Sequence, residues 1–157
     1  MLPITNINYE LDIAKVLKIM DLAKTRSQIY HEKTKIFRWT HNIKHPYFYK
    51  VMKDLNVIGY ADFYFQEANS FLIPHTDPKC LCAINFVLSP DPSPVTFYEN
   101  ATSKDELGNA THYTYSQAIL NTTIFHSVQT GNTERTLFKI CIQNESYESV
   151  VKRLTVT

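Results

Sequence analysis

The sequence predicts a mainly β fold, an antiparallel sandwich or barrel, preceded by two helices. Between residues 57 and 142 the chain is rich in aromatic and β-branched residues, which favour strands, and they occur in short runs separated by polar or proline-containing breaks. The chain has ten Tyr and nine Phe but only three Gly. Its 157 residues suffice for one core and are too few for two ordinary domains. We therefore expect one domain over residues 1–157, with a helical flank over about 1–56 and a β-core over about 57–142.

Two amphipathic helices are predicted in the helical flank. The first covers residues 9–24, where apolar residues recur every three or four positions and form one face: Ile13, Val16, Leu17, Met20 and Ala23. The second covers residues 46–55, because Pro46 suits the first position of a helix. Its apolar face, which ends before Asn56, consists of Phe48, Val51, Met52 and Leu55. Between the helices, the alternating segment Lys35–Thr40 predicts a strand that contains the only Trp.

Seven strands are predicted in the β-core, over residues 57–66, 71–75, 80–88, 94–99, 111–120, 122–129 and 135–142. The segment Ser89–Pro94 contains three prolines, which cannot join a central ladder, so we expect a turn there. Residues 100–110 are polar and charged and predict a solvated loop. Strands at this spacing are typical of a sandwich or barrel, with the helices outside and the interior free for a site.

Composition excludes some classes of partner. The chain has 16 Lys and Arg against 15 Asp and Glu, so no overall field attracts nucleic acid or an anionic membrane, and we expect neither as a partner. No apolar run approaches the roughly 18 residues of a membrane-spanning helix, and the first residues lack the pattern of an export leader. We therefore expect a cytoplasmic protein. The oligomeric state does not follow from the sequence.

The cysteines Cys80, Cys82 and Cys141 form an odd set without a spaced framework, which favours reduced thiols over a disulfide scaffold. Cys80 and Cys82 could supply half of a zinc site, but no second Cys or His pair has suitable spacing. We expect both side chains to lie in the core, on the strand face opposite Asn85.

The segment Phe71–Pro78 contains the pair around which the candidate site is built, His75 and Asp77. In an extended strand, side chains at positions i and i+2 point to the same face, so an imidazole and a carboxylate would be aimed at one point, as a metal ion requires. His126 is the best candidate for a third ligand. The alternative interpretation is a polar turn, because Asp-Pro is a frequent turn element.

Two imidazoles and one carboxylate on one side of a metal leave coordination positions open, the arrangement that suits non-haem Fe(II) oxygenases. A structural zinc site would instead be closed by four protein ligands. Arg135 lies nine residues beyond His126, and we expect it to start the next antiparallel strand, which would bring its guanidinium near the metal ligands. Its planar fork suits a bidentate contact with a carboxylate. The alternative is a surface residue paired with Glu134 or Glu145.

The ordered pattern of His75-x-Asp77, His126 and Arg135 resembles the Fe(II)/2-oxoglutarate-dependent dioxygenases, over roughly residues 57–142. The sequence most resembles the compact prolyl, aspartyl and asparaginyl hydroxylase-like members of that family. Three neighbouring segments also resemble it: Cys82–Leu88 the strand after the first two ligands, Pro94–Tyr98 the family's Gly-Gly-x-Thr-x-Phe strand, and His126–Val128 its His-x-Val. One departure is that Ser93 and Pro94 stand where two glycines are usual, which affects the turn beside the site and removes no ligand.

The resemblance implies a double-stranded β-helix, or jelly-roll, in which His75, Asp77 and His126 bind Fe(II). It also implies 2-oxoglutarate and O2 as cosubstrates, with Arg135 paired to the distal carboxylate of 2-oxoglutarate. In this family, further contacts to 2-oxoglutarate often come from a Tyr or Asn that lines the barrel, so Tyr64 and Asn85 are candidates, with plain packing as the alternative for both. No catalytic residue beyond the metal ligands is predicted.

The implied reaction is hydroxylation of an unactivated carbon, with release of succinate and CO2. The substrate would be a peptide side chain or a small metabolite, and the small size of the chain favours a substrate presented from outside. The competing hypothesis is a non-catalytic or cupin-like metal-binding β-barrel module, which needs no 2-oxo acid. The remaining histidines match no pattern and are expected to make ordinary hydrogen bonds: His31, His41, His45 and His112.

Overall fold

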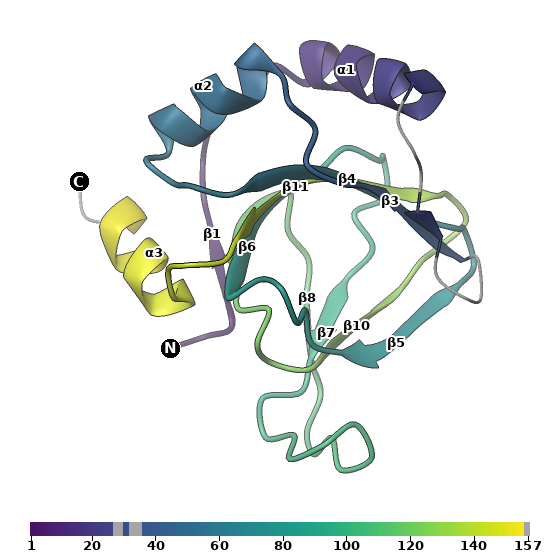
Figure 1. Cartoon of the computed structure of the whole chain (residues 1–157). Helices are drawn as coiled ribbons and strands as arrows, with labels where there is room; N and C mark the ends of the chain where they lie inside the picture. Colours follow the sequence, from purple (N-terminus) through teal and green to yellow (C-terminus); the bar gives the residue numbers. More distant parts are fainter. Residues whose placement is uncertain (27–29, 32–35, 156–157) are drawn as a thin grey trace.

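The computed structural model describes residues 1–26, 30–31 and 36–155 and contains two antiparallel sheets packed face to face (Figure 1). Among these residues, one sheet has seven strands: β1 (Ile4–Asn6), β2 (Tyr30–His31), β3 (Phe37–Thr40), β4 (Tyr60–Gln66), β6 (Cys82–Val87), β9 (Gln117–Leu120) and β11 (Arg135–Ile142). The other described sheet has four: β5 (Phe71–His75), β7 (Val95–Phe97), β8 (Thr111–Tyr113) and β10 (His126–Gln129).

The strand order is that of a jelly-roll. The larger sheet runs β1-β9-β6-β11-β4-β3-β2 and the smaller sheet β5-β10-β7-β8, so most spatial neighbours are distant in sequence. β11 lies at the centre of the larger sheet, paired along its length with β4 on one side and β6 on the other. The mainly β jelly-roll expected from the sequence is confirmed.

The described residues form three helices, α1 (Ile13–Arg26), α2 (Pro46–Asp54) and α3 (Tyr147–Thr155). α2 begins at Pro46, as the sequence predicts, because Nδ1 of His45 accepts a hydrogen bond from the backbone N–H of Tyr47 at 3.0 Å and caps the helix. It ends before Asn56, whose φ of 52° is left-handed. The sequence interpretation includes α1 and α2 but lacks α3.

The helices cover the outer face of the larger sheet. In Figure 1, α1 and α2 lie over β3 and β4, and α3 lies beside β1 and β6. One apolar core joins the buried faces of all three helices to this side of the sheet. At its centre the ring of Phe138 stacks on Phe48 of α2 and on Phe86 of β6, with ring centroids 4.4 and 5.4 Å apart. This packing fixes β11, because Phe138 is fully buried between helix and sheet.

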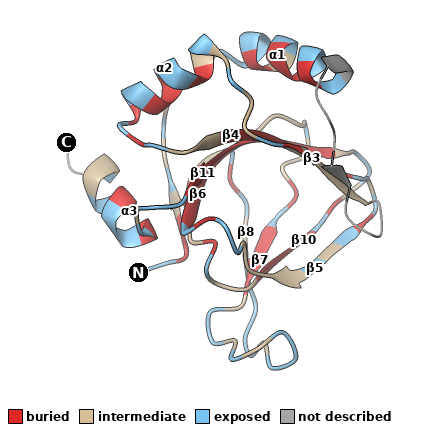
Figure 2. Cartoon of the chain, in the orientation of Figure 1, coloured by how far each residue is buried: buried red, intermediate tan, exposed pale blue. Residues whose placement is uncertain are grey.

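All eight residues of β11 are buried, because both faces of the strand are covered (Figure 2). Successive side chains of a strand point to opposite faces. Phe138, Ile140 and Ile142 therefore join the core beneath the helices. The alternate residues face the space between the two sheets and line a pocket there: Arg135, Leu137, Lys139 and Cys141.

Two strand predictions are wrong in detail. The stretch expected as one strand over residues 111–120 is two strands, β8 in the smaller sheet and β9 in the larger, so the chain crosses between the sheets around Tyr115. The strand expected over residues 122–129 begins only at His126. Both errors have one cause: a continuous run of β-forming residues does not show where the chain leaves one sheet for the other.

The expectation of three reduced thiols is also wrong. Cys80 and Cys141 form a disulfide, with Cα atoms 5.5 Å apart across 61 residues of sequence. Cys80 faces the pocket instead of the core, whereas Cys82 lies in the core beneath the helices as expected. Stable disulfides are typical of oxidising compartments, so the cysteines no longer support a cytoplasmic location, which stays a prediction. No helix in the described part of the chain is both long and apolar enough to cross a bilayer.

Alkylation will test this cysteine assignment. Burial raises the pKa of the Cys82 thiol to about 12, with the charges of Glu145 and Glu148 adding to the effect, so native Cys82 should react slowly with iodoacetamide. Mass spectrometry of the denatured, unreduced protein should show one alkylated cysteine, and reduction should raise the number to three. The double change of Cys80 and Cys141 to Ser should lower the free energy of unfolding by about 4 kcal/mol. Three alkylated cysteines before reduction would contradict the disulfide.

Candidate functional site

Strand register brings the two candidate imidazole ligands together. His75 is the last residue of β5 and His126 the first of β10, and the two are direct partners in the antiparallel pairing of these strands. Their ring centroids are 4.5 Å apart. Residues separated by fifty positions in the sequence therefore present their side chains side by side at one end of the smaller sheet.

The backbone fixes how both imidazoles face the site. Nδ1 of His75 lies 2.7 Å from the carbonyl oxygen of Ile73, and Nδ1 of His126 lies 2.7 Å from that of Ile124. A carbonyl oxygen only accepts hydrogen bonds, so each Nδ1 carries a proton and donates it. When the ring is neutral, Nε2 keeps a free lone pair, which is the form that binds a metal ion. When the ring is protonated, Nε2 carries a proton that it can donate to a neighbouring carboxylate.

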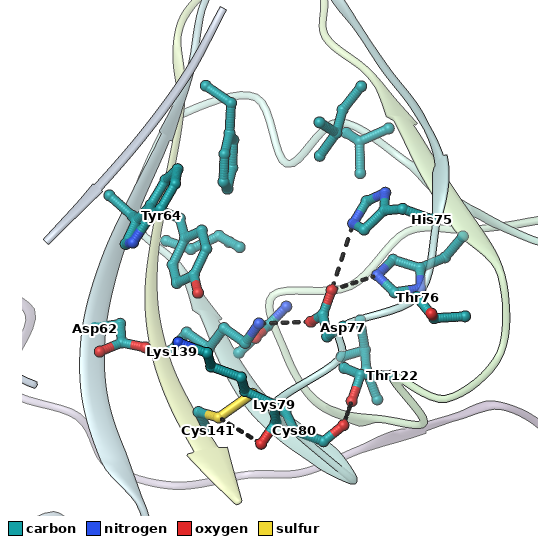
Figure 3. Close-up of a pocket in the computed structure, with 18 of the residues that line it drawn as sticks. Asp62, Tyr64, His75, Thr76, Asp77, Lys79, Cys80, Thr122, Lys139 and Cys141 are labelled. Carbon is teal, nitrogen blue, oxygen red and sulfur yellow. Dashed lines mark hydrogen bonds and ion pairs between the residues drawn. A yellow bond between two sulfur atoms is a disulfide. The ribbon is translucent and has the colours of Figure 1, made fainter. Parts of the chain in front are cut away.

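Asp77 completes the group, although it does not lie on the strand that the i and i+2 interpretation assumes. β5 ends at His75, and Asp77 follows in the loop, where its backbone N–H donates to the carbonyl of Thr122 at 3.0 Å. Its Oδ1 nevertheless lies 3.4 Å from Nε2 of His75 and 3.5 Å from Nε2 of His126. Figure 3 shows the carboxylate of Asp77 pointing toward the ring of His75.

These three side chains fit a divalent metal ion. One ligand atom from each of His75, Asp77 and His126 lies within 4.8 Å of the other two. Two ligand atoms on adjacent corners of an octahedron with bonds of about 2.1 Å are about 3 Å apart, so only small movements would close the site on an ion. No fourth His, Cys, Asp or Glu within the described ranges joins the group. The donor set of two imidazoles and one carboxylate leaves coordination open.

Lys139 supplies a positive charge beside these candidate ligands. Its Nζ lies 2.7 Å from Oδ2 of Asp77 and 4.6 Å from the centroid of the Tyr64 ring. Burial alone would raise the pKa of the Asp77 carboxyl, but the ammonium of Lys139 and hydrogen bonds from His126 and His75 hold that pKa well below its usual range. Burial likewise opposes the charge on Lys139, yet Asp77, Tyr64 and Asp62 raise the pKa of its ammonium. Both partners are therefore charged at neutral pH.

The candidate metal site opens into one pocket of about 730 Å³ between the sheets, and Arg135 lies in the same pocket. Arg135 is buried, with 5% of its surface exposed, and among the described residues no carboxylate pairs with it as one would with a surface arginine. Its Nε donates to the carbonyl oxygen of Pro92 at 3.4 Å and its Nη2 to the hydroxyl of Tyr115 at 3.0 Å. Nδ2 of Asn85 donates to the same hydroxyl at 2.9 Å. Tyr115 is itself buried and holds the guanidinium against the pocket.

The remaining sequence candidates also line the pocket. Tyr64 is half-buried on β4 and contacts Lys139 rather than Arg135. Asn85 contacts Tyr115, and its buried Oδ1 has no hydrogen-bond partner. Beside Tyr64, the rings of Phe37 and Trp39 form an aromatic surface, with the Phe37 centroid 5.1 Å from Tyr64 and 5.8 Å from Trp39. The pocket thus has polar groups at Arg135 and at the candidate metal ligands, and an aromatic surface beside Tyr64.

The turn that departs from the family pattern keeps the conformation for which glycine is suited. Ser93 has a φ of 53°, in the left-handed region that glycine adopts without strain. Its backbone N–H donates to Oδ1 of Asp91 at 2.9 Å, a local bond that supports the turn. A serine here therefore preserves the approach of the chain to β7.

The other histidines have ordinary partners where they are described. Nδ1 of His112 bonds Oγ1 of Thr96 at 2.7 Å, and Nδ1 of His41 lies 3.2 Å from Oδ1 of Asp62. His41 also lines the pocket, which the sequence interpretation did not anticipate. The side chain of His31 lies outside the described residues.

Two residues of the candidate site are missing from the sequence interpretation: Lys139, which lines the pocket, and Tyr115, which bonds Arg135. Lys139 is four positions after Arg135, so strand alternation places both side chains on one face. This even spacing could have identified Lys139 as a residue of the candidate site. Tyr115 lies where the chain passes from β8 to β9, outside any strand, and no periodicity could have placed its hydroxyl beside Arg135.

Comparison with known proteins supports the fold at low sequence identity. No family model matches the chain, and no curated protein matches it. Among solved structures, the epimerase SnoN from nogalamycin biosynthesis, described as non-haem and α-ketoglutarate dependent, matches with a TM-score of 0.63 and 10% identity over 87% of this chain and 76% of that chain. A prolyl-4-hydroxylase from Pseudomonas putida matches with a TM-score of 0.56 and 11% identity over 91% of this chain and 94% of that chain. HygX from Streptomyces hygroscopicus was solved with nickel and 2-oxoglutarate bound. It matches with a TM-score of 0.55 and 11% identity over 92% of this chain and 85% of that chain.

The fold is that of the 2-oxoglutarate-dependent Fe(II) oxygenases. The same fold also occurs in the DMSP lyase DddQ from Ruegeria pomeroyi DSS-3, with a TM-score of 0.55 and 10% identity over 87% of this chain and 66% of that chain. The fold therefore narrows the chemistry without determining the reaction, which depends on the site residues.

Loss of His126 should abolish divalent-metal binding. His126→Ala removes one of three candidate ligand atoms, so affinity for Co(II) or Mn(II), measured by calorimetry, should fall by more than the roughly 10- to 100-fold typical for loss of an outer-shell partner. His112→Ala is the matched control, because His112 is exposed on β8 and outside the candidate site. Equal binding by wild-type protein and His126→Ala would refute the site.

Metal affinity should increase with pH. Burial opposes protonation of His75, but the hydrogen bond and charge of Asp77 raise its pKa above the ordinary value. Protonated His75 therefore stabilises the metal-free fold below the unfolded pKa, and this contribution is lost as pH rises through the raised folded pKa. Metal binding must release that proton, so calorimetry from about pH 6 to 8 in buffers of different ionisation enthalpy should show proton release and rising affinity. A pH-independent affinity without proton release would contradict this assignment.

Proposed function

We propose that the protein is an Fe(II)- and 2-oxoglutarate-dependent oxygenase that hydroxylates an unactivated carbon of a peptide side chain or small metabolite, with release of succinate and CO2. The observation that carries the proposal is the placement, in one pocket, of the open group of His75, Asp77 and His126 and of Arg135, a buried arginine without a carboxylate partner among the described residues. A metal site alone would not require that arginine.

Arg135 suits the distal carboxylate of 2-oxoglutarate. Its guanidinium lines the pocket, and one of its N–H donors is bonded to the hydroxyl of Tyr115 and one to the carbonyl oxygen of Pro92, so further donors stay available for a carboxylate. A buried arginine without a carboxylate is costly, so an anionic ligand would stabilise this end of the pocket. The nickel and 2-oxoglutarate bound in HygX, which shares the fold, support this cosubstrate.

When bound, the metal and 2-oxoglutarate would supply the oxidising chemistry through O2. The chain's own part is to hold and orient these groups. His75, Asp77 and His126 would hold the ion from one side and leave the other side open. Apolar side chains around them restrict water: Leu72, Val95, Leu120, Val128 and Leu137.

The mouth of the pocket supports a substrate presented from outside. Ile73 beside the site is 66% exposed, and Phe71 on the same strand is 45% exposed. The half-buried rings of Phe37 and Trp39 line the same pocket. An apolar side chain of a peptide would fit against these apolar surfaces, and we propose that class ahead of a free metabolite.

A cupin-like site with another divalent metal and no 2-oxo acid is the alternative. It accounts for the three candidate ligands but gives Arg135, Tyr115 and Asn85 no common purpose. Anaerobic titration with Fe(II) and then 2-oxoglutarate separates the two hypotheses, because bidentate binding of a 2-oxo acid to Fe(II) produces a visible charge-transfer band. The oxygenase should show this band and form succinate under O2. A site that binds Fe(II) but shows neither would favour the cupin-like module.

Replacement of Arg135 should weaken 2-oxoglutarate binding specifically. Arg135→Met removes charged hydrogen bonds, so the Kd for 2-oxoglutarate at the loaded site should rise roughly 10- to 100-fold while metal affinity stays unchanged. Tyr115→Phe should give a smaller rise in the same Kd. Arg153→Met is the matched control, since Arg153 pairs with Glu145 near α3. If Arg135→Met binds 2-oxoglutarate as tightly as wild type, the assigned role is wrong.

A further inference from the structure

We propose that Lys139 is a positioning residue of the candidate metal centre: its ammonium holds Oδ2 of Asp77, so that this carboxylate offers one oxygen atom, Oδ1, to the ion. The inference rests on the proposed function, because it assumes a divalent ion held by His75, Asp77 and His126. It goes beyond that function by giving a role to a cation that the three-ligand pattern does not require.

The two oxygens of Asp77 have separate partners. Oδ1 faces Nε2 of both histidines, at 3.4 and 3.5 Å, where an ion would lie between the three atoms. Oδ2 points the other way and accepts a hydrogen bond from Nζ of Lys139 at 2.7 Å. Figure 3 shows the carboxylate between His75 on one side and Lys139 on the other. A carboxylate held in this way cannot turn both oxygens toward one ion.

The side chain of Lys139 is held in one position by its surroundings. It lies in the middle of β11, where the backbone pairs with Asp62 on β4 and with Asn85 on β6. Its side chain is 8% exposed and lies against the ring of Tyr64, with Nζ 4.6 Å from the centroid. A lysine side chain is ordinarily mobile, so this enclosure removes the rotamer freedom that would make it a poor anchor.

Asp77 needs such an anchor because no strand ladder sets its direction. It lies two residues beyond the end of β5, and its backbone is held by the bond from its N–H to the carbonyl of Thr122 at 3.0 Å. A loop carboxylate with two free oxygens could rotate about its side-chain bonds or bind an ion through both atoms. The contact with Lys139 removes these alternatives, so the protein would contribute three ligand atoms and keep the other positions open.

Charge alone would argue against a lysine at this position. A buried ammonium repels a divalent cation, and the repulsion is strong where water is excluded. Two roles therefore predict opposite effects when the ammonium is removed. If Lys139 acts only as a neighbouring charge, its loss should strengthen metal binding. If it positions Asp77, its loss should weaken metal binding despite the relief of repulsion.

The test compares metal affinity in variants of the full chain. Lys139→Met keeps the length and apolar stem but removes the ammonium, and its Kd for Co(II) or Mn(II) by calorimetry should rise about 10- to 100-fold. Lys139→Arg, which retains a charged donor, should recover part of the lost affinity. Lys104→Met, on the exposed 100–110 loop, is the matched control and should bind metal as wild type does.

A second measurement uses the wild-type protein alone, so the test does not depend on the folding of Lys139→Met. The infrared difference between metal-loaded and metal-free protein isolates the carboxylate that binds the ion. A wide separation of its two C–O stretching bands, which marks binding through one oxygen, is expected for the wild-type protein.

The outcomes separate this inference from the proposed function. Equal or tighter metal binding by Lys139→Met, or binding of Asp77 through both oxygens in the wild type, would overturn the role of Lys139 while leaving the metal site in place. Failure of the wild-type protein to bind any divalent metal would overturn both proposals.

Discussion

The central constraint of the structure is the burial of β11 on both faces. Helices cover one side of this strand and the smaller sheet faces the other. Successive side chains therefore alternate between the core beneath the helices and the space between the sheets. Phe138 and Ile140 satisfy the helical side by packing. On the inner side, Arg135 and Lys139 bring positive charge into the interior, where charges are stable only with partners. The hydroxyl of Tyr115 and the carbonyl of Pro92 accept hydrogen bonds from Arg135, and Asp77 is the charged partner of Lys139.

The loop that contains Asp77 depends on the same strand. Cys80 is joined to Cys141, two positions beyond Lys139, and the backbone N–H of Leu81 donates to the carbonyl of Ile142 at 2.8 Å. The loop between the two sheets is thereby tied to the centre of the larger sheet by covalent and hydrogen bonds. The disulfide thus contributes to the site as well as to stability, because it limits how far the carboxylate of Asp77 can move from the imidazoles.

The sequence predicts the jelly-roll, two of the helices and the grouping of His75, Asp77 and His126, because strand periodicity and an ordered motif report on local geometry. It does not predict the pairing of Cys80 with Cys141, since connectivity depends on the fold and not on spacing. The hydroxyl of Tyr115 is unpredictable for the same reason: its place follows from a crossing between sheets. Lys139 is an intermediate case, because alternation gives its face, but a lysine in a strand is ordinarily solvated.

The two cations on β11 also define the distance across which a ligand would lie. Arg135 and Lys139 are four residues apart, which is about 13 Å along an extended strand. Both side chains line the pocket between the sheets. Arg135 donates to Tyr115 and to the carbonyl of Pro92 and keeps further N–H donors at the pocket. An unpaired buried polar group costs about 1–3 kcal/mol, so these donors would be stabilised by a ligand that accepts hydrogen bonds and reaches from the metal ligands to Arg135. Such donors suit a short dicarboxylate, as in the proposed function, better than an apolar ligand.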